Sequence, residues 1–182
     1  TGGSLFTYSI EAGNNPTSYD IAKGAATWLT VNPETGQVSG IAPILPFIVQ
    51  QQIQLLAIND GGTGTATLTI TITPATPVIS SAATAEGTAN SGFQYQIEAS
   101  NLPTEYQIAG FPAGYSVDMD SGLITGSPTG QASFTGQIFA GNAGGTGFAT
   151  LAVTIHRPVP AITSPLTASG VNGTAFSYQI TA

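Results

Sequence analysis

One short alternating stretch occurs three times in this chain. It has the form Phe-x-Tyr-x-Ile-x-Ala and occupies residues 6–12, 93–99 and 176–182. Apolar and polar residues alternate strictly, which is the period of a β-strand with one face buried and the other in water. A shift of one residue would turn both aromatic rings and the isoleucine to solvent, so the register is well specified. The stretch therefore predicts a core strand of a module that the chain repeats.

The similarity between the copies extends well beyond this strand. Tyr8, Tyr95 and Tyr178 lie 87 and 83 residues apart. A period above 80 residues is too long for a solenoid unit, whose repeats run about 20–45 residues, and suits an independent small domain in tandem. The further matched stretches are residues 11–19 with 98–106, 30–40 with 116–126, and 59–64 with 142–147.

The pattern of the whole chain is typical of an all-β protein. No stretch carries a sustained helical apolar pattern, and Gly and Pro interrupt the sequence every ten residues or so. Short alternating strands at that spacing predict a β-sandwich. Two opposed sheets should share a core, with the side chains Gln94, Gln96 and Thr154 outside. We expect six side chains to point inward: Phe93, Tyr95, Ile97, Leu151, Val153 and Ile155.

Two proline-rich joints, residues 73–77 and 156–160, divide the chain. Proline fixes φ and removes an amide donor, so we expect short, extended and fairly stiff joints. Each joint leads into a similar Pro-x-Ile opening. We therefore predict module one at 1–76 without its first strand, a complete module two at 77–158, and a segment at 159–182 that is either the first strands of a third module or a donor tail.

Charge and cysteine content exclude several classes of protein. The chain has 2 basic against 9 acidic residues, a net charge of −7, and only 6% charged residues against the usual 25% or so. This excludes a nucleic-acid binder, which needs a basic stripe, and argues against anionic membrane surfaces. With no cysteine, neither a disulfide nor a thiolate metal site can form.

No membrane insertion is expected. The longest apolar run, residues 41–49, is far shorter than the roughly 20 residues that a helix needs to cross a bilayer, and it contains two prolines. The chain starts at Thr1 without a basic start and an apolar signal region, which suggests a mature or excised piece.

Four ordered motifs carry a family resemblance. They are Pro-x-Ile-x-Ser, then Phe-x-Tyr-x-Ile-x-Ala-x-Asn-x-Pro-x-x-Tyr, then Ser-x-Asp-x-x-Ser-Gly-x-Ile-x-Gly-Ser-Pro, then Asn-x-Gly-Gly-Thr-Gly. In this order they resemble the bacterial Ig-domain repeats of the dystroglycan-type, cadherin-like group. The resemblance covers nearly the whole chain. It implies tandem Ig-like, cadherin-like β-sandwich modules in a secreted or surface-anchored bacterial protein, and it implies no enzymatic activity.

Residues 118–122, Asp-Met-Asp-Ser-Gly, have the alternating acids of a calcium-loop start. An EF-hand loop needs a glutamate at its twelfth position, where this chain has Thr129. The module-one counterpart, residues 32–36, keeps one acid, and the two joints lack the acidic residues with which cadherins bind calcium between modules. We favour a hairpin turn with Gly122 at positive φ over calcium, and predict no metal and no cofactor.

The other candidates also have plain interpretations. The Gly-rich stretches 59–64 and 142–147 lack the Gly-Lys-Ser/Thr of a phosphate loop, so we interpret them as loops between strands. Lys23, with Glu11 on a nearby strand, is a candidate for an isopeptide crosslink. The module-two counterpart of Lys23 is Gly110, which excludes a crosslink repeated in both modules, so we expect a solvated lysine. His156 has no nucleophile motif nearby and is expected to be a surface linker residue.

Catalysis is not expected, and sugar binding stays open. Glu11 and Glu98 face outward, and Thr181 replaces them in the third copy, which disfavours a paired-carboxylate glycosidase. The tripeptide Asn172-Gly173-Thr174 fits a glycosylation acceptor, but Asn-Gly is also a turn dipeptide and the turn is favoured. Three aromatics could form a sugar-stacking platform, although core or corner positions are more usual. They are Trp28, Tyr19 and Tyr106.

The sequence thus favours a structural role, a tandem-repeat stalk or fibre at a bacterial cell surface. Its partners would be copies of itself or neighbouring repeats. An adhesive module that binds carbohydrate or another surface is the alternative. Module one lacks a counterpart of residues 77–83, so we expect an open sheet edge. Either residues upstream in a longer tandem chain complete it, which we favour, or residues 160–168 of another copy do so by strand donation.

Overall fold

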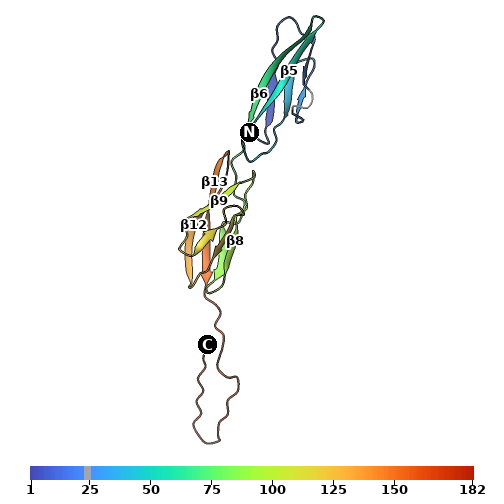
Figure 1. Ribbon diagram of the computed structural model, residues 1–182. Coiled ribbons are helices and arrows are strands. Elements are labelled where there is room, and N and C mark those ends of the chain that lie inside the picture. Colours follow the sequence, from blue (N-terminus) through green and yellow to red (C-terminus); the bar gives the residue numbers. More distant parts are fainter. Residues whose placement is uncertain (23–25) are drawn as a thin grey trace.

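The computed structural model describes residues 1–22 and 26–182. Within these ranges the secondary structure is β-strand, without helix, and Figure 1 shows two elongated sandwiches end to end. No described segment could cross a bilayer as an apolar helix. Module one contains β1 (Leu5–Ser9), β2 (Ser18–Ile21), β3 (Leu29–Val31), β4 (Gln37–Ile41), β5 (Val49–Asn59) and β6 (Gly62–Ile72). Module two contains β7 (Thr84–Thr88), β8 (Phe93–Gln96), β9 (Glu105–Ala109), β10 (Tyr115–Val117), β11 (Leu123–Gly126), β12 (Ala132–Asn142) and β13 (Gly145–His156).

Module two is a sandwich of a three-stranded sheet, β10-β11-β8, and a four-stranded sheet, β7-β13-β12-β9. The predicted packing is confirmed: Gln94 and Gln96 are exposed, while the predicted apolar residues lie in the core between the sheets. The burial of two side chains differs in degree from the prediction: Tyr95, expected inside, and Thr154, expected outside, are both half-buried. The fully covered side chains are Phe93, Ile97, Leu151, Val153 and Ile155.

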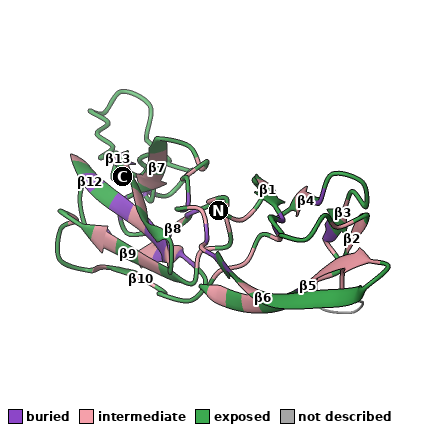
Figure 2. Ribbon diagram, turned by 90° about the horizontal axis from the view of Figure 1, so that it is seen from above, coloured by how far each residue is buried: buried purple, intermediate pink, exposed green. Residues whose placement is uncertain are grey.

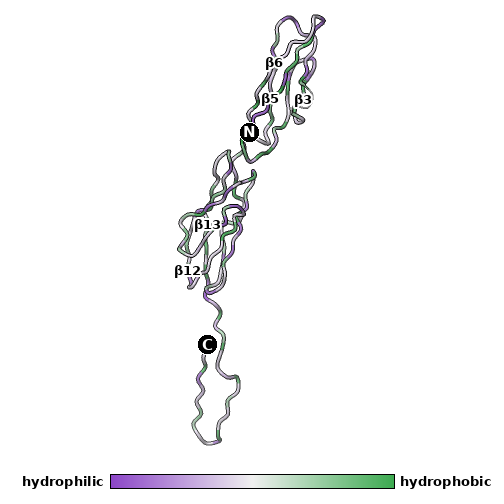
Figure 3. Tube along the Cα trace, viewed as in Figure 1, coloured by the Kyte–Doolittle hydropathy of each residue, from purple (hydrophilic) through white to green (hydrophobic). Residues whose placement is uncertain are grey.

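Module one repeats this architecture with sheets β1-β4-β3 and β2-β5-β6. Its strands correspond in order to β8–β13, and its core residues follow the same alternation. Figure 3 shows hydrophobic and hydrophilic residues interspersed along both modules. What differs is β7. In module two β7 pairs in parallel with β13, from Ala152 opposite Thr84 to His156 opposite Thr88. The described part of module one has no equivalent strand, so the matching edge of β6, residues 69–72, has no strand beside it there.

The part missing from module one is longer than the sequence suggested. The N–H of Gly2 donates to the Thr73 carbonyl at 2.9 Å, as the N–H of Ala89 donates to the His156 carbonyl at 2.8 Å. Module one therefore matches module two from about residue 88 onward. The segment of module two without a counterpart runs through β7 to Gly87. The sequence comparison ended it at residue 83, because β7 carries too few apolar residues to be recognised as a strand.

Residues 74–88, hereafter the opening segment, cover both sheets of module two. Ile79 bridges Ala99 beside β8, and the N–H groups of Ser80 and Ser81 donate to the Glu98 carbonyl at 2.9 and 3.3 Å. The chain then crosses to the other sheet and becomes β7. The Tyr95 hydroxyl donates to the Ala82 carbonyl at this crossing, 2.5 Å away. The opening segment thus closes one edge of each sheet.

Tyr95→Ala should destabilise module two by about 2–3 kcal/mol, below the cost for a fully buried ring, because the side chain is half-buried. The loss includes the hydroxyl bond to Ala82. Glu98→Ala should cost less than about 0.5 kcal/mol because the side chain is exposed. Urea unfolding of both variants checks this, and equal losses would contradict the assignment of faces.

The joint between the modules is packed rather than free. Pro74 and Pro77 are buried. The Asn142 side-chain amide donates to the Ala75 carbonyl at 2.9 Å and that of Asn101 to the Thr76 carbonyl at 2.8 Å. One bond also joins the modules directly, from the Ala143 N–H at the tip of module two to a module-one carbonyl, 3.2 Å away. The joint is therefore held against the β12–β13 tip.

Residues 157–182, hereafter the tail, form no strand. They nevertheless make hydrogen bonds within the tail that are equivalent to those between the opening segment and residues 95–98 of module two. The N–H of Thr163 donates to the Thr181 carbonyl at 2.8 Å, as Ser80 does to Glu98, and the Tyr178 hydroxyl donates to the Pro165 carbonyl. The tail folds back on its own final stretch, because residues 176–182 supply the acceptors that residues 93–99 supply in module two. The first strands of a third module would make such bonds, and donation of this segment to another copy stays a prediction.

Candidate interaction groove

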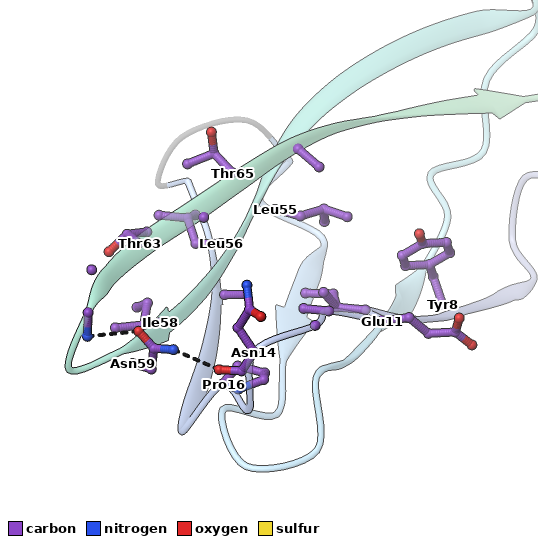
Figure 4. A pocket seen from close by; sticks show the side chains of 18 residues that line it. Tyr8, Glu11, Asn14, Pro16, Leu55, Leu56, Ile58, Asn59, Thr63 and Thr65 are labelled. Atoms are coloured by element: carbon purple, nitrogen blue, oxygen red, sulfur yellow. Dashed lines mark hydrogen bonds between the residues drawn. The ribbon is translucent and has the colours of Figure 1, made fainter.

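A groove of about 690 Å³ opens at the tip of module one, the end remote from module two. We call it the tip groove; it is lined by Tyr8, residues 10–14, Pro16, residues 55–59 and residues 61–66. Figure 4 shows Tyr8 and Glu11 on one wall and the β5–β6 hairpin on the other. Leu55 is buried at 5% exposure, whereas Tyr8 is 37% exposed. The groove thus combines an apolar floor with an accessible phenol.

Two asparagines shape the end of the tip groove. The Asn59 side-chain amide donates to the Asn14 carbonyl at 2.8 Å, and its Oδ1 accepts the Gly61 N–H at 2.9 Å (Figure 4). Asn14 holds φ at 60°, a left-handed conformation that asparagine adopts more readily than most residues. The groove therefore presents amide groups and backbone carbonyls, chemistry suited to a polar backbone or a sugar.

The Gly-rich stretches lie at hairpin tips and not in loops outside the sheet. Residues 62–64 are the start of β6, and residues 145–147 are the start of β13. The interpretation as loops between strands is right for the turns at residues 60–61 and 143–144, whereas the glycines that follow begin a strand, which their weak strand propensity hid. The repeated Asn-x-Gly-Gly-Thr-Gly motif was the available signal for the tip groove.

The acidic stretch at 118–122 is a turn, as predicted. The Asp118 carboxylate accepts the N–H groups of Ser121 at 2.8 Å and Asp120 at 3.0 Å, and Gly122 has φ of 75°. Asn32 makes the same bonds in module one, to the N–H groups of Glu34 and Thr35. No cluster of three or more His, Cys, Asp or Glu suited to a metal occurs among the described residues.

Hydrogen bonds from the Ser121 N–H and hydroxyl and the Asp120 N–H hold the pKa of Asp118 below its ordinary 3.8. A lowered folded-state pKa stabilises the fold above the unfolded pKa and loses this effect as pH falls through the folded value. Asp118→Asn should therefore flatten the loss of module-two stability below about pH 4. Urea melts from pH 6 to pH 2 check this; an unchanged slope would contradict it. The turn should persist, since Asn32 supports one.

The three aromatic residues pack against the module cores, the placement that the sequence favoured over a sugar-stacking platform. Trp28 packs edge-on against Phe6 with ring centroids 5.8 Å apart, and its Nε1 donates to the Gln51 side chain at 2.9 Å. Tyr19 packs on the core of module one and Tyr106 on that of module two. These rings are therefore core and corner residues, the more usual role that the sequence also allowed.

The remaining candidates are dispersed. His156 Nε2 lies 3.7 Å from a Glu86 carboxylate oxygen, and both side chains are exposed. Glu11 and Glu98 are exposed and lie in different modules. The Asn172-Gly173-Thr174 stretch is a turn, with Gly173 at φ of 82°. Lys23, the proposed isopeptide residue, lies outside the described residues.

No protein-family model matches this chain, and no curated protein is a significant match. Solved structures do resemble it. Extracellular domains 3–5 of Drosophila OTK give a TM-score of 0.47 at 12% identity, covering 85% of this chain and 56% of that one. Sidekick-1 immunoglobulin domains 1–5 give 0.41 at 15%, covering 86% and 37%. A candidate alpha-galactosidase from Bacteroides fragilis gives 0.43 at 25%, covering 45% and 18%.

The chain spans less than two thirds of the length of each of these proteins. The strands and their order define the class: this is an all-β protein built of β-sandwich modules.

Proposed function

We propose that this chain is a structural segment of a bacterial extracellular protein, in which tandem Ig-like repeats of the dystroglycan type form a surface stalk or fibre. The observation that carries the proposal is the packed joint, where two buried prolines and the Asn142 and Asn101 amides hold the linker on the tip of module two. A joint of this kind transmits force and direction from one module to the next. Neighbouring repeats or other copies would continue the array, by strand donation in the second case.

The proposed role is non-enzymatic. The carboxylates Glu11 and Glu98 belong to different modules, and the exposed His156 side chain lies 3.7 Å from the Glu86 carboxylate. The low charge also suits a passive spacer, because its polar surface rests on uncharged side chains.

Small-angle X-ray scattering of the full chain tests the stalk. The expected result is a rod with the two modules end to end, and a single conformation that fits the curve. A compact particle, or an ensemble of widely bent particles, would contradict the proposal. Electron microscopy of the same material would show whether rods join into filaments.

Carbohydrate adhesion is the second candidate, favoured by one observation. The tip groove offers an exposed phenol, Tyr8, at one end and the Asn14 and Asn59 side chains at the other, groups that can stack on and hydrogen-bond to sugars. A glycan array distinguishes the candidates. Specific glycan binding that Tyr8→Ala abolishes would favour adhesion, and its absence would favour the stalk.

Asn142→Ala should loosen the joint. The side chain donates to the Ala75 and Asn101 carbonyls and accepts the Gly144 N–H, and removing these bonds should cost module two about 2 kcal/mol. Scattering should then show a wider distribution of inter-module angles. Asn59→Ala is the matched control, because Asn59 makes the equivalent tip bonds without a linker to hold. Equal flexibility in both variants would contradict the role of Asn142.

A further inference from the structure

The outward face of the four-stranded sheet in module two carries two neighbouring phenylalanine side chains. On β12, Ile138 and Ala140 are buried in the core, so Phe139 between them points away from it. Phe148 lies directly opposite on β13. Figure 2 shows buried and exposed bands along the β12 ribbon, as the alternation of a strand requires. We call Phe139 and Phe148 the phenylalanine pair.

The two rings contact each other without covering each other. Their centroids are 6.3 Å apart, and their planes are tilted by 41°. Phe139 is half-buried, but Phe148 remains 68% exposed. Cross-strand aromatic pairs stabilise a hairpin through their mutual contact, yet here the larger part of one side chain lies in water. The phenylalanine pair therefore presents apolar ring surface to the solvent.

Uncharged polar groups lie beside the pair on the same face. Gln107 of β9 is opposite Phe139, and Gln137 and Thr150 form the next outward cross-strand pair along β12 and β13. All three polar side chains are exposed. Amides and hydroxyls can both donate and accept hydrogen bonds, so these groups can satisfy the hydroxyls of a bound molecule.

A carboxylate lies on the other side of the pair. A Cβ added to Gly141 would be 2.9 Å from a carboxylate oxygen of Glu105, so this side chain occupies the space that a residue of β12 would otherwise fill. Gly141 is two residues from Phe139 on the same face, about 7 Å along the strand. The chain's only lysine and arginine, Lys23 and Arg157, lie outside these strands. The face thus adds one strong acceptor beside the rings.

Module one has different residues at the equivalent positions. They are Leu56 and Thr65, which lie opposite each other on β5 and β6, and Asp20 takes the place of Gln107 beside them. The two long hairpins pair in the same register. The fold itself therefore does not require aromatic rings at this point of the sheet, and the phenylalanine pair is a property of module two.

The size and charge of the patch decide which class of ligand it fits. A phenylalanine side chain buries about 150–250 Å², so the pair falls well below the roughly 800 Å² per partner of a stable protein interface. With a carboxylate and no lysine or arginine on these strands, the patch also disfavours anions such as phosphate and sulfated sugars. A neutral sugar chain needs an apolar ring to stack on and partners for its hydroxyls, and the patch offers both.

We propose that the phenylalanine pair binds an uncharged polysaccharide. Sugar rings stack across Phe139 and Phe148, and their hydroxyls bond to the Gln107 and Gln137 amides and the Glu105 carboxylate. The inference goes beyond the stalk, which needs no ligand, and the site is separate from the tip groove. A stalk with such a site would hold a neutral sugar layer against its side.

Titration calorimetry of the full chain tests the site, with cellohexaose, xylohexaose and mannohexaose as probes after a screen on a glycan array. Phe148→Thr and Phe139→Leu introduce the module-one residues and should each weaken binding at least tenfold. Phe148→Trp should keep binding within about threefold, because it retains a stacking ring. Urea unfolding checks that these variants fold. Tyr8→Ala and Thr65→Ala in module one are the matched controls and should bind like the unmodified chain.

Several results would overturn the proposal. They are the absence of binding to any neutral glycan, binding that survives both Phe148→Thr and Phe139→Leu, and a preference for sulfated or uronic-acid glycans. Binding lost only in Tyr8→Ala would place the sugar in the tip groove instead. In sedimentation equilibrium, a mean mass that rises with concentration for the unmodified chain but not for Phe148→Thr would assign the pair to contact between copies. The end-to-end rod in scattering is independent of all these results, so failure of this site and failure of the stalk are distinguishable.

Discussion

Replacing Leu151 with alanine is expected to destabilise module two by about 3–4 kcal/mol. The side chain is fully buried in β13, at the centre of the core between the two sheets. Deleting three buried carbon atoms removes their transfer free energy and leaves a cavity, and leucine-to-alanine changes at such sites cost about 2–5 kcal/mol. Urea unfolding of the full chain, with Tyr fluorescence and circular dichroism as probes, gives the value.

The matched variant is Leu68→Ala in module one. Leu68 is the counterpart of Leu151 but is only half-buried, so we expect a loss of about 1–2 kcal/mol. Each substitution should shift the unfolding transition of its own module and leave the other in place, since each module has its own core. Losses of equal size at the two positions would contradict the difference in burial.

The predicted sandwich followed from the alternation of a few strands. Phe93 and Ile97 point inward and Gln94 and Gln96 outward because an alternating strand with one apolar face has only one register that buries it. The turn at Asp118 was equally visible in the sequence, because the Asp-x-x-Ser-Gly pattern carries its own hydrogen bonds and its glycine at positive φ.

Strand β7 could not be recognised from the sequence. Its residues, Thr-Ala-Glu-Gly-Thr, carry little apolar signal, and its stability comes from parallel pairing with β13, about seventy residues further along the chain. The tip groove could be predicted only in part, from the repeated glycine-rich motif on one of its walls, for a related reason. Its walls come from residues 8–16 and 55–66, and only the fold brings these stretches together. The core positions of Trp28 and Tyr106 were the interpretation that the sequence favoured, because large aromatic rings in a small sandwich usually pack against its core.

Gly147→Val is expected to have the second large effect, a loss of about 2–3 kcal/mol in module two. The added Cβ would overlap the Pro77 carbonyl oxygen, so the opening segment has to move away from the β12–β13 tip. That movement also strains the bonds that Asn101 and Asn142 make to the joint. Proteolysis within residues 74–83 should become faster, and scattering should show a more mobile joint.

The same substitution at the equivalent position of module one isolates the cause. Gly64 has no positive φ, and its added Cβ would meet nothing closer than 3.8 Å, so Gly64→Val should change the stability of module one by less than about 0.5 kcal/mol. A β-branched residue also suits a strand, so propensity alone predicts a small gain at both sites. Only the segment docked on module two predicts a large loss of stability for Gly147→Val and almost no change for Gly64→Val. If both variants lose the same stability, the glycines serve the hairpins themselves and not a segment that passes over them.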